Sequence, residues 1–166
     1  MKNVVIAVFL GIVSCTFLFS QQMTQEKLYE LIAKASDSVN KNGNSIQFLV
    51  KDRLLICISD ANANRMRIIS PITERKQLDD EMLLNALVAN FHTALDVKYA
   101  ISDEIIWSVF IHPLKELSDN QVLDAISQVY YANINFGGTF SSTSLIFPGN
   151  TQKKEEKKQP LPLKKF

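Results

Sequence analysis

The stretch LDDEMLLNALVANFHTALDVKYAISDEIIWSVFIH, residues 78–112, decides the fold. Its first half predicts a helix over residues 78–95, with acidic side chains at 79–81 that suit the positive end of the helix dipole. On a helical wheel one broad arc is apolar: Leu83, Leu84, Leu87, Val88, Phe91, Ala94 and Leu95. We expect this arc to be buried, since each fully buried Leu or Phe contributes roughly 1.5–3 kcal/mol.

The second half of the stretch predicts a β-hairpin. Residues 97–101 and 104–111 have the β-branched and aromatic composition of strands, and Ser102-Asp103 is a short polar break between them. Alternation in the second strand puts Ile105, Trp107, Val109 and Ile111 on one face and Ile106, Ser108 and Phe110 on the other. Both faces are at least partly apolar, which favours an inner strand or a strand that meets a partner.

The chain before this stretch predicts a helix and three strands. Thr24 can cap a helix over residues 24–41, in which Leu28, Ile32, Ala35 and Val39 share one face. Residues 45–50, 54–59 and 65–70 then form an antiparallel meander. The apolar run 54–59 indicates a strand buried on both sides, and Pro71 is expected to end the third strand.

The chain after the stretch predicts a last helix. Ser118 and Gln121 have the spacing of a capping box, and Gly137-Gly138 supplies the end. Its inner face is Val122, Ala125, Ile126, Val129, Ala132 and Asn133. The sequence thus predicts an α+β fold with an antiparallel sheet of about five strands, in the order α-β-β-β-α-β-β-α.

Residues 1–20 have the layout of a secretory signal peptide: Lys2, a nearly continuous apolar run over residues 4–19, and then a polar chain from Gln21. Cleavage near Ser20 predicts an exported protein, periplasmic or secreted. Two alternatives stay open. Ile12-Val13-Ser14-Cys15 resembles a lipobox, which predicts lipidation at Cys15, and an uncleaved leader predicts a retained anchor.

Charge separates a single domain over residues 21–150 from a tail over residues 151–166. The domain carries 15 acidic and 11 basic side chains, so we do not expect it to bind nucleic acid. The tail is rich in Lys, Glu and Pro and is expected to be disordered. Membrane contact is expected only through a lipidated Cys15 or through this basic tail.

The residues that carry chemistry form no recognisable active site. His92 and His112 have no second ligand at metal-binding spacing, and no glycine-rich phosphate loop or nucleophile elbow occurs. Cys57 lies in an apolar run and is expected to be a buried, inert thiol. We therefore expect no catalysis, no metal and no cofactor.

The element order, together with four stretches, resembles the YbjN-like family, whose fold is that of the type III secretion chaperones (the Tir-chaperone-like fold). The stretches are the Arg-rich strand 65–70, the helix 83–95 with Asn90, the hairpin 97–111 and the capped helix 117–129. The resemblance covers residues 24–136. It implies a non-enzymatic α+β module that often dimerises and presents hydrophobic grooves to partner polypeptides. The type III chaperones themselves are cytoplasmic and strongly acidic, whereas this chain has a leader and is mildly acidic.

Our functional hypothesis is an exported, non-catalytic protein-binding module, chaperone-like or regulatory. The residues expected to contact a partner are Ile105, Trp107, Val109, Ile111 and Tyr130. A homodimer through the sheet or the last helix is a further expectation. The alternative function is a carrier or sensor of an apolar small molecule in the cell envelope.

Overall fold

The structure is a computed structural model that describes residues 22–144. The predicted signal peptide, Cys15 and the predicted tail from residue 151 lie outside the described residues. The expectations of cleavage, lipidation and disorder therefore stay predictions.

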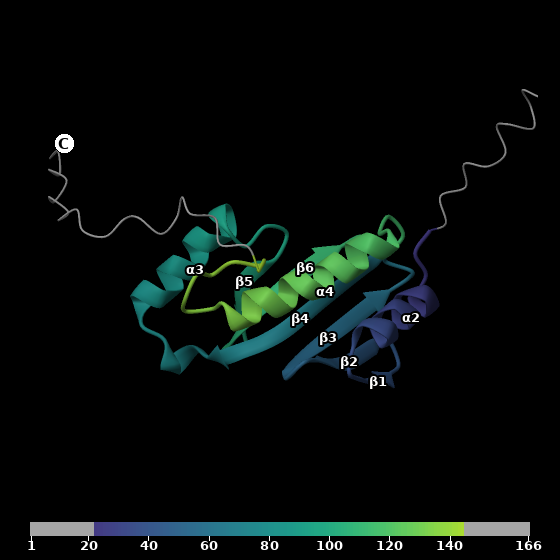
Figure 1. Cartoon of the computed structure of the whole chain (residues 1–166), viewed down its shortest axis with the longest axis horizontal. Coiled ribbons are helices and arrows are strands. Elements are labelled where there is room, and N and C mark those ends of the chain that lie inside the picture. The colour runs from purple at the N-terminus through teal and green to yellow at the C-terminus, as the bar shows by residue number, and fades with distance from the viewer. Residues whose placement is uncertain (1–21, 145–166) are drawn as a thin grey trace, which may run out of the picture.

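Six strands form one antiparallel sheet, and three α-helices accompany it (Figure 1). The strand order in the sheet is β1-β2-β3-β4-β6-β5, with every neighbouring pair antiparallel. This confirms the predicted α+β class and adds one strand to the expected five. The bounds are α2 Gln25–Ala35, β1 Ser38–Asn42, β2 Ser45–Val50, β3 Arg53–Asp60, β4 Arg65–Glu74, the 3-10 helix η2 Arg75–Gln77, α3 Asp80–His92, β5 Lys98–Ser102, β6 Ile105–His112 and α4 Asp119–Ile134.

Helices α2 and α4 lie on the same face of the sheet. In Figure 1, α4 crosses in front of the sheet along β4, and α2 lies over the β1–β2 end. The side chains between these layers are fully buried, among them Leu28 and Ile32 of α2, Phe48 of β2, Ile68 of β4 and Val122 of α4. Alternation along β2, β3, β4 and β6 places every second residue in this core.

The first helix ends six residues earlier than predicted. Helix α2 stops at Ala35, and Val39, expected on its buried face, belongs instead to the edge strand β1. The residues after Ala35 include Ser, Asp and Asn, which bond readily to nearby backbone and weaken a helix. Pairing with β2, in which Val39 lies opposite Phe48, then favours the strand.

Two expectations about the meander were wrong. Strand β3 is not buried on both sides, because Leu54 and Ile58 point away from the helices and are exposed. Pro71 does not end β4, which continues to Glu74 across a shift of register between Pro71 and Thr73. Proline has no N–H, and a bulge accommodates the missing ladder bond.

Helix α3 differs most from its prediction. It starts where expected, with the Asp79 carboxylate accepting from the Met82 N–H at 2.7 Å, but it ends at His92. Most of its predicted apolar arc is not buried: Leu83 is half-buried and Ala94, which follows the helix, is buried, but Leu84, Leu87, Val88, Phe91 and Leu95 are exposed. The buried residues of the helix are Ala86 and Ala89, which lie outside that arc. The covered face of the sheet is already filled by α2 and α4, and α3 lies beyond the end of the sheet, where β5 is its principal neighbour.

Candidate functional site: the open face of the sheet

On the face of the sheet opposite α2 and α4, no helix formed by residues 22–144 lies over the strands. The strand residues that point to this face are all exposed or half-buried in the described structure, whereas their neighbours on the other face are mostly fully buried. Antiparallel sheets often bury one face and solvate the other, and the solvated face then carries polar side chains. This face does not follow that rule.

Three adjacent strands place apolar side chains side by side on this open face. The register aligns Ile56 of β3 with Ile69 of β4, and Ile69 with Val109 of β6. Neighbouring positions continue the patch along the strands, with Pro71 opposite Trp107 in one direction and Ile111 in the other. We call this patch the open apolar face; its members are Leu54, Ile56, Ile58, Ile69, Pro71, Ile105, Trp107, Val109 and Ile111.

The structure places four of the five predicted partner-binding residues together. Ile105, Trp107, Val109 and Ile111 share the open apolar face, and Ile111 is 59% exposed. The Trp107 indole N–H donates to the Ser102 carbonyl at 3.1 Å. Tyr130 does not join them: it is buried on α4, its ring meets that of Tyr131 edge to face, and the Lys51 ammonium lies over it.

Sequence reasoning missed the members of the open apolar face that come from β3 and β4. Leu54, Ile56 and Ile58 alternate along β3 in the same way that Ile105 to Ile111 alternate along β6. The signal was therefore present in the run 54–59, but an uninterrupted apolar run is equally compatible with burial on both sides.

Charged groups border the open apolar face and limit what it accepts. Arg67 lies between Ile58 and Ile111 in the strand register, and Arg65 stands opposite Asp60 at the strand ends. At the β1–β2 end, Leu49 and Leu54 help to line a surface hollow of about 380 Å³. An apolar centre with polar groups at its rim is the usual anatomy of a protein–protein interface.

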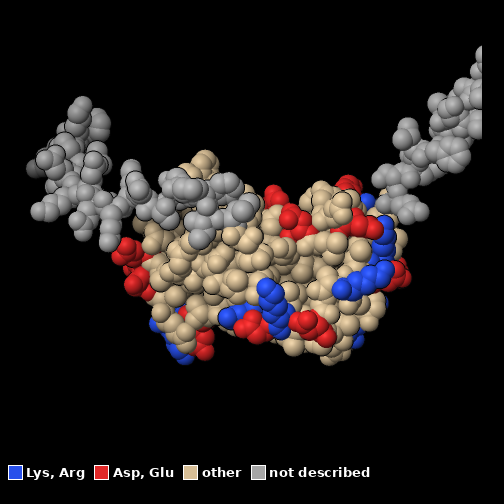
Figure 2. All heavy atoms as spheres, in the orientation of Figure 1, with Lys and Arg blue, Asp and Glu red and all other residues tan. Residues whose placement is uncertain are grey.

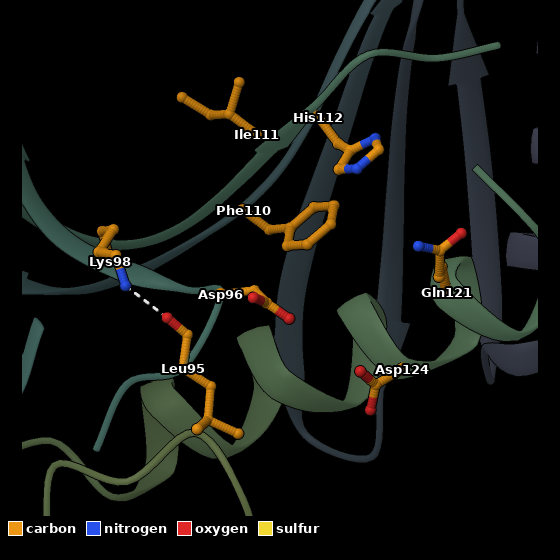
Figure 3. A pocket seen from close by; sticks show the side chains of 8 residues that line it. All are labelled: Leu95, Asp96, Lys98, Phe110, Ile111, His112, Gln121 and Asp124. Atoms are coloured by element: carbon orange, nitrogen blue, oxygen red, sulfur yellow. Dashed lines mark hydrogen bonds between the residues drawn. The ribbon is translucent and has the colours of Figure 1, made fainter. Parts of the chain in front are cut away.

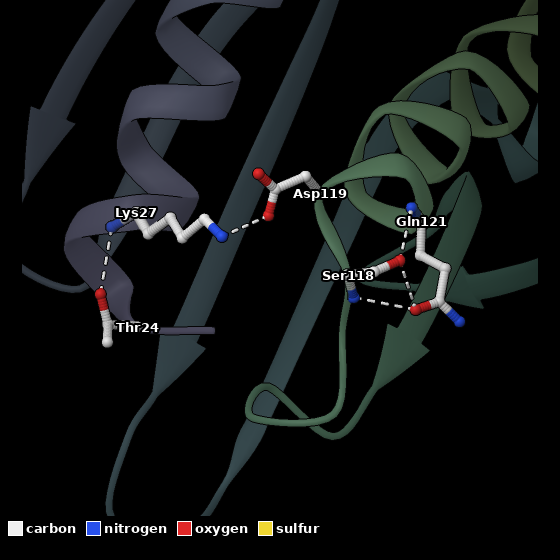
Figure 4. Close-up of polar contacts among 5 residues, drawn as sticks. All are labelled: Thr24, Lys27, Ser118, Asp119 and Gln121. Atoms are coloured by element: carbon white, nitrogen blue, oxygen red, sulfur yellow. Dashed lines mark hydrogen bonds and ion pairs between the residues drawn. The ribbon is translucent and has the colours of Figure 1, made fainter. Parts of the chain in front are cut away.

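Helices α2 and α4 are fixed at their N-termini on the opposite side of the sheet (Figure 4). The Ser118 hydroxyl accepts from the Gln121 N–H at 3.3 Å, and the Gln121 side chain accepts from the Ser118 N–H at 2.8 Å, which confirms the predicted capping box. Thr24 caps α2, and Lys27 forms an ion pair with Asp119. These contacts fix both helices on one face of the sheet, so neither of them covers the open apolar face.

A separate hollow of about 360 Å³ lies between β5, β6 and the start of α4 (Figure 3). Two carboxylates at this hollow, those of Asp96 and Asp124, both accept from the Gln128 side-chain amide. The His112 ring stacks on Phe110, and its Nδ1 lies 2.8 Å from the Pro113 carbonyl. The two carboxylates are joined through Gln128, and His112 is bonded to backbone, so no nucleophile and base are paired among these groups.

Two buried groups have raised pKa values because burial disfavours their charged forms. The pKa of the Cys57 thiol rises from 9.0 to about 12, and that of the Tyr99 hydroxyl also rises. Cys57 is fully buried, which confirms the expected inert thiol. Tyr99 donates its hydroxyl hydrogen to the Ala132 carbonyl of α4 at 3.0 Å.

Residues 22–144 contain no cluster of three or more His, Cys, Asp or Glu side chains arranged to hold a metal ion. In the same residues, every helix is too short or too polar to cross a membrane.

Comparisons with known proteins show the fold. No protein-family model and no curated protein sequence matches the chain. Among solved structures, it is similar to the type III secretion chaperone SycH of Yersinia pestis, determined with a stable fragment of YscM2, with a TM-score of 0.54, 11% identity, and coverage of 69% of this chain and 100% of that chain. It is also similar to a chain of the HopA1–SchA chaperone–effector complex, with a TM-score of 0.51, 10% identity, and coverage of 66% and 92%. The fold is therefore that of the type III secretion chaperones.

Proposed function

We propose that the protein is a non-catalytic, polypeptide-binding module and that the open apolar face binds an apolar segment of its partner. The observation that carries this proposal is the size of the face: nine apolar positions on three adjacent strands, with no element of the described chain over them. Contiguous exposed apolar patches commonly mark interaction sites. The fold it shares with proteins crystallised in chaperone–effector complexes supports the same role.

The partner's chemistry follows from the rim of the face. An apolar segment covers Ile56, Ile69 and Val109, and an acidic side chain beside it can pair with Arg67. Arginine at the edge of an apolar patch forms bidentate contacts with carboxylates. The preferred partner is therefore an apolar segment that carries an acidic residue.

Export, kinship and assembly complete the proposal. The layout of residues 1–20 supports export to the periplasm or the medium. Mass spectrometry of the mature N-terminus tests this. It distinguishes cleavage near Ser20 from lipidation at Cys15 and from a retained leader. The element order, apart from the added strand β1, and the four stretches named above support kinship with the YbjN-like family. A homodimer through the sheet is a further proposal, which a monomer mass by light scattering at micromolar concentration contradicts.

The small-molecule alternative has less support. The layer between the sheet and helices α2 and α4 is filled by side chains such as Phe48, Leu55 and Ile68, each less than 3% exposed. A carrier of an apolar molecule needs a concave apolar site that encloses most of its ligand. The open apolar face is better suited to a polypeptide than to an enclosed ligand.

The test is suppression of aggregation of a chemically unfolded model polypeptide when it is diluted from denaturant. We expect the protein to suppress light scattering and Ile111→Glu to weaken this effect by about tenfold, because a charge then replaces an apolar contact worth roughly 1–2 kcal/mol. Leu123→Glu is the matched control, since Leu123 is an exposed apolar residue on α4. No suppression by the unmodified protein, or an equal loss in both variants, contradicts the proposal.

A further inference from the structure

Helix α3 presents a second uncovered apolar surface, separate from the open apolar face. Leu84, Leu87, Val88 and Phe91 are between 50% and 87% exposed, and their spacing of i, i+3, i+4 and i+7 puts them in one stripe. We call these four residues the α3 stripe. In Figure 2, acidic atoms gather at the end where α3 begins in Figure 1. An apolar stripe of this kind on a helix surface needs an occupant.

The last described residues of the chain are fixed beside the C-terminal end of α3. The Ser142 N–H donates to the Thr93 carbonyl at 3.2 Å, and the Thr93 hydroxyl donates to the Phe140 carbonyl at 3.0 Å. Phe140 is buried and meets the rings of Tyr99 and Phe136 edge to face. The sequence after Ser144 therefore starts next to the end of α3 that carries Phe91.

We propose that the segment 145–158 of this chain lies along α3 and covers the α3 stripe. This segment begins with Leu145-Ile146-Phe147, the apolar residues nearest to the fixed position. Three residues span at most about 10 Å, which brings their side chains to Phe91 and Val88. The proposal is independent of what binds the open apolar face.

Charge and length support the same path. Helix α3 has 13 residues, a length of about 20 Å. Lys153 and Lys154 follow Ser144 by nine and ten residues, which is up to about 30 Å of chain and enough to reach the start of α3. Residues 74–81, at the start of α3, carry four carboxylates and two cations. Glu74 pairs with Lys76 and Asp80 with Arg75, so the negative charges of Asp79 and Glu81 are in excess there.

Covalent connection favours this segment over a second copy of the chain. A segment tethered a few residues away has an effective concentration in the millimolar range, far above that of a second copy at micromolar protein. The second copy therefore binds the α3 stripe only when the segment is displaced or removed.

The test is photo-cross-linking of the full chain, with a photoreactive phenylalanine analogue at position 91 and products mapped by mass spectrometry. At low micromolar concentration we expect monomeric products in which position 91 is joined to residues 145–150. Products of twice the monomer mass overturn the proposal in favour of a second copy, and monomeric products without cross-links to residues 145–158 overturn it outright. The analogue at position 123 on α4, which lies on the exposed side of a different helix, should give no cross-link to this segment.

Charge variants test the path of the segment along α3. Lys153→Glu with Lys154→Glu should lower the cross-linking yield at position 91 at least threefold, because both side chains then repel the acidic start of α3. Lys164→Glu with Lys165→Glu makes the same change of charge beyond residue 158 and should leave the yield unchanged. An unchanged yield in the first variant, or an equal loss in both, overturns the proposed path.

Discussion

Helices α4 and α3 are both amphipathic, and they have opposite fates. In α4, the apolar side faces the sheet, and eight of its residues are buried, including Ile126 and Val129. In α3, only the small residues Ala86 and Ala89 are fully buried, Met82 packs against the edge of the core, and the four residues of the α3 stripe are exposed. An apolar stripe thus indicates that this side of a helix contacts another apolar surface. Its position relative to the sheet decides whether that contact is internal.

The largest expected effect is a difference in the free energy of unfolding that is lost when an apolar residue of α4 or of α3 is replaced. Ile126→Ala in α4 should lower the free energy of unfolding by about 2–5 kcal/mol, because Ile126 is 3% exposed and its loss leaves a cavity. Leu87→Ala on α3 should cost only about 1 kcal/mol even with segment 145–158 over it, because Leu87 is 65% exposed in the described chain and a surface contact contributes less than a core one. Urea denaturation measures both. Similar costs would show that α3 is packed as tightly as α4 and would remove the contrast.

A smaller effect concerns the two asparagines that fix these helices. On α3, the Asn90 side chain donates to the Tyr99 carbonyl at 3.2 Å and accepts from the Tyr99 N–H at 2.7 Å. On α4, the Asn133 amide donates to Ser70 Oγ and to the Pro71 carbonyl, both at 2.8 Å. Each substitution by Ala should cost about 1–3 kcal/mol, because buried partners lose hydrogen bonds.

Native-state hydrogen exchange distinguishes the two asparagine variants. Asn90→Ala should speed exchange of the α3 amides and leave that of the α4 amides unchanged, since α3 can open locally. Asn133→Ala should speed exchange of the most protected amides of the sheet as well. If Asn90→Ala accelerates exchange in both helices equally, α3 is not a separate unit.

The smallest expected effect is a loss of folding stability at alkaline pH, and it comes from groups in the core that α4 covers. Burial raises the pKa of Cys57 from 9.0 to about 12, and burial also raises that of Tyr99. In the unfolded chain the Cys57 thiol ionises above pH 9, while in the folded chain it stays neutral. The stabilisation is therefore complete below pH 9 and is lost as the pH rises toward 12. At pH 10 the loss from Cys57 is about 1 kcal/mol.

Urea denaturation between pH 7 and 11 measures this loss. Cys57→Ala should lower stability at every pH but flatten its decline above pH 9, and Tyr99→Phe should flatten the decline that begins near pH 10. A decline of unchanged slope in both variants would show that other groups cause the alkaline loss.

Local patterns in the sequence predicted the elements whose signals are short-range. The capping box at Ser118, the strand Ser45–Val50 and the alternation of Ile105–Ile111 all depend on neighbours within a few residues, and all three were confirmed. Asn90, a polar side chain at the edge of the apolar arc, bonds the backbone of Tyr99, because buried polar groups need a hydrogen-bond partner.

The features that sequence analysis missed depend on distant parts of the chain. Strand β1 exists because β2 offers an edge to residues 38–42, and no local signal separates those residues from the end of a helix. The open apolar face and the α3 stripe both require knowing that α2 and α4 occupy the same side of the sheet. The periodicity of α3 located an apolar arc, but the prediction that this arc is buried was mostly wrong, because the topology places the helix beyond the end of the sheet.

The path of the chain around α3 has a consequence for how this protein can change over evolution. Strands β4 and β6 are neighbours in the sheet, yet η2, α3 and β5 lie between them in sequence. The Arg75 N–H donates to the Glu104 carbonyl at 2.7 Å, so the two ends of this excursion meet, and β5 within it pairs with β6 at the edge of the sheet. Residues 75–104 are therefore joined to the rest of the chain as an insertion. Their length and outer surface can diverge between lineages while the strands on either side keep their pairing.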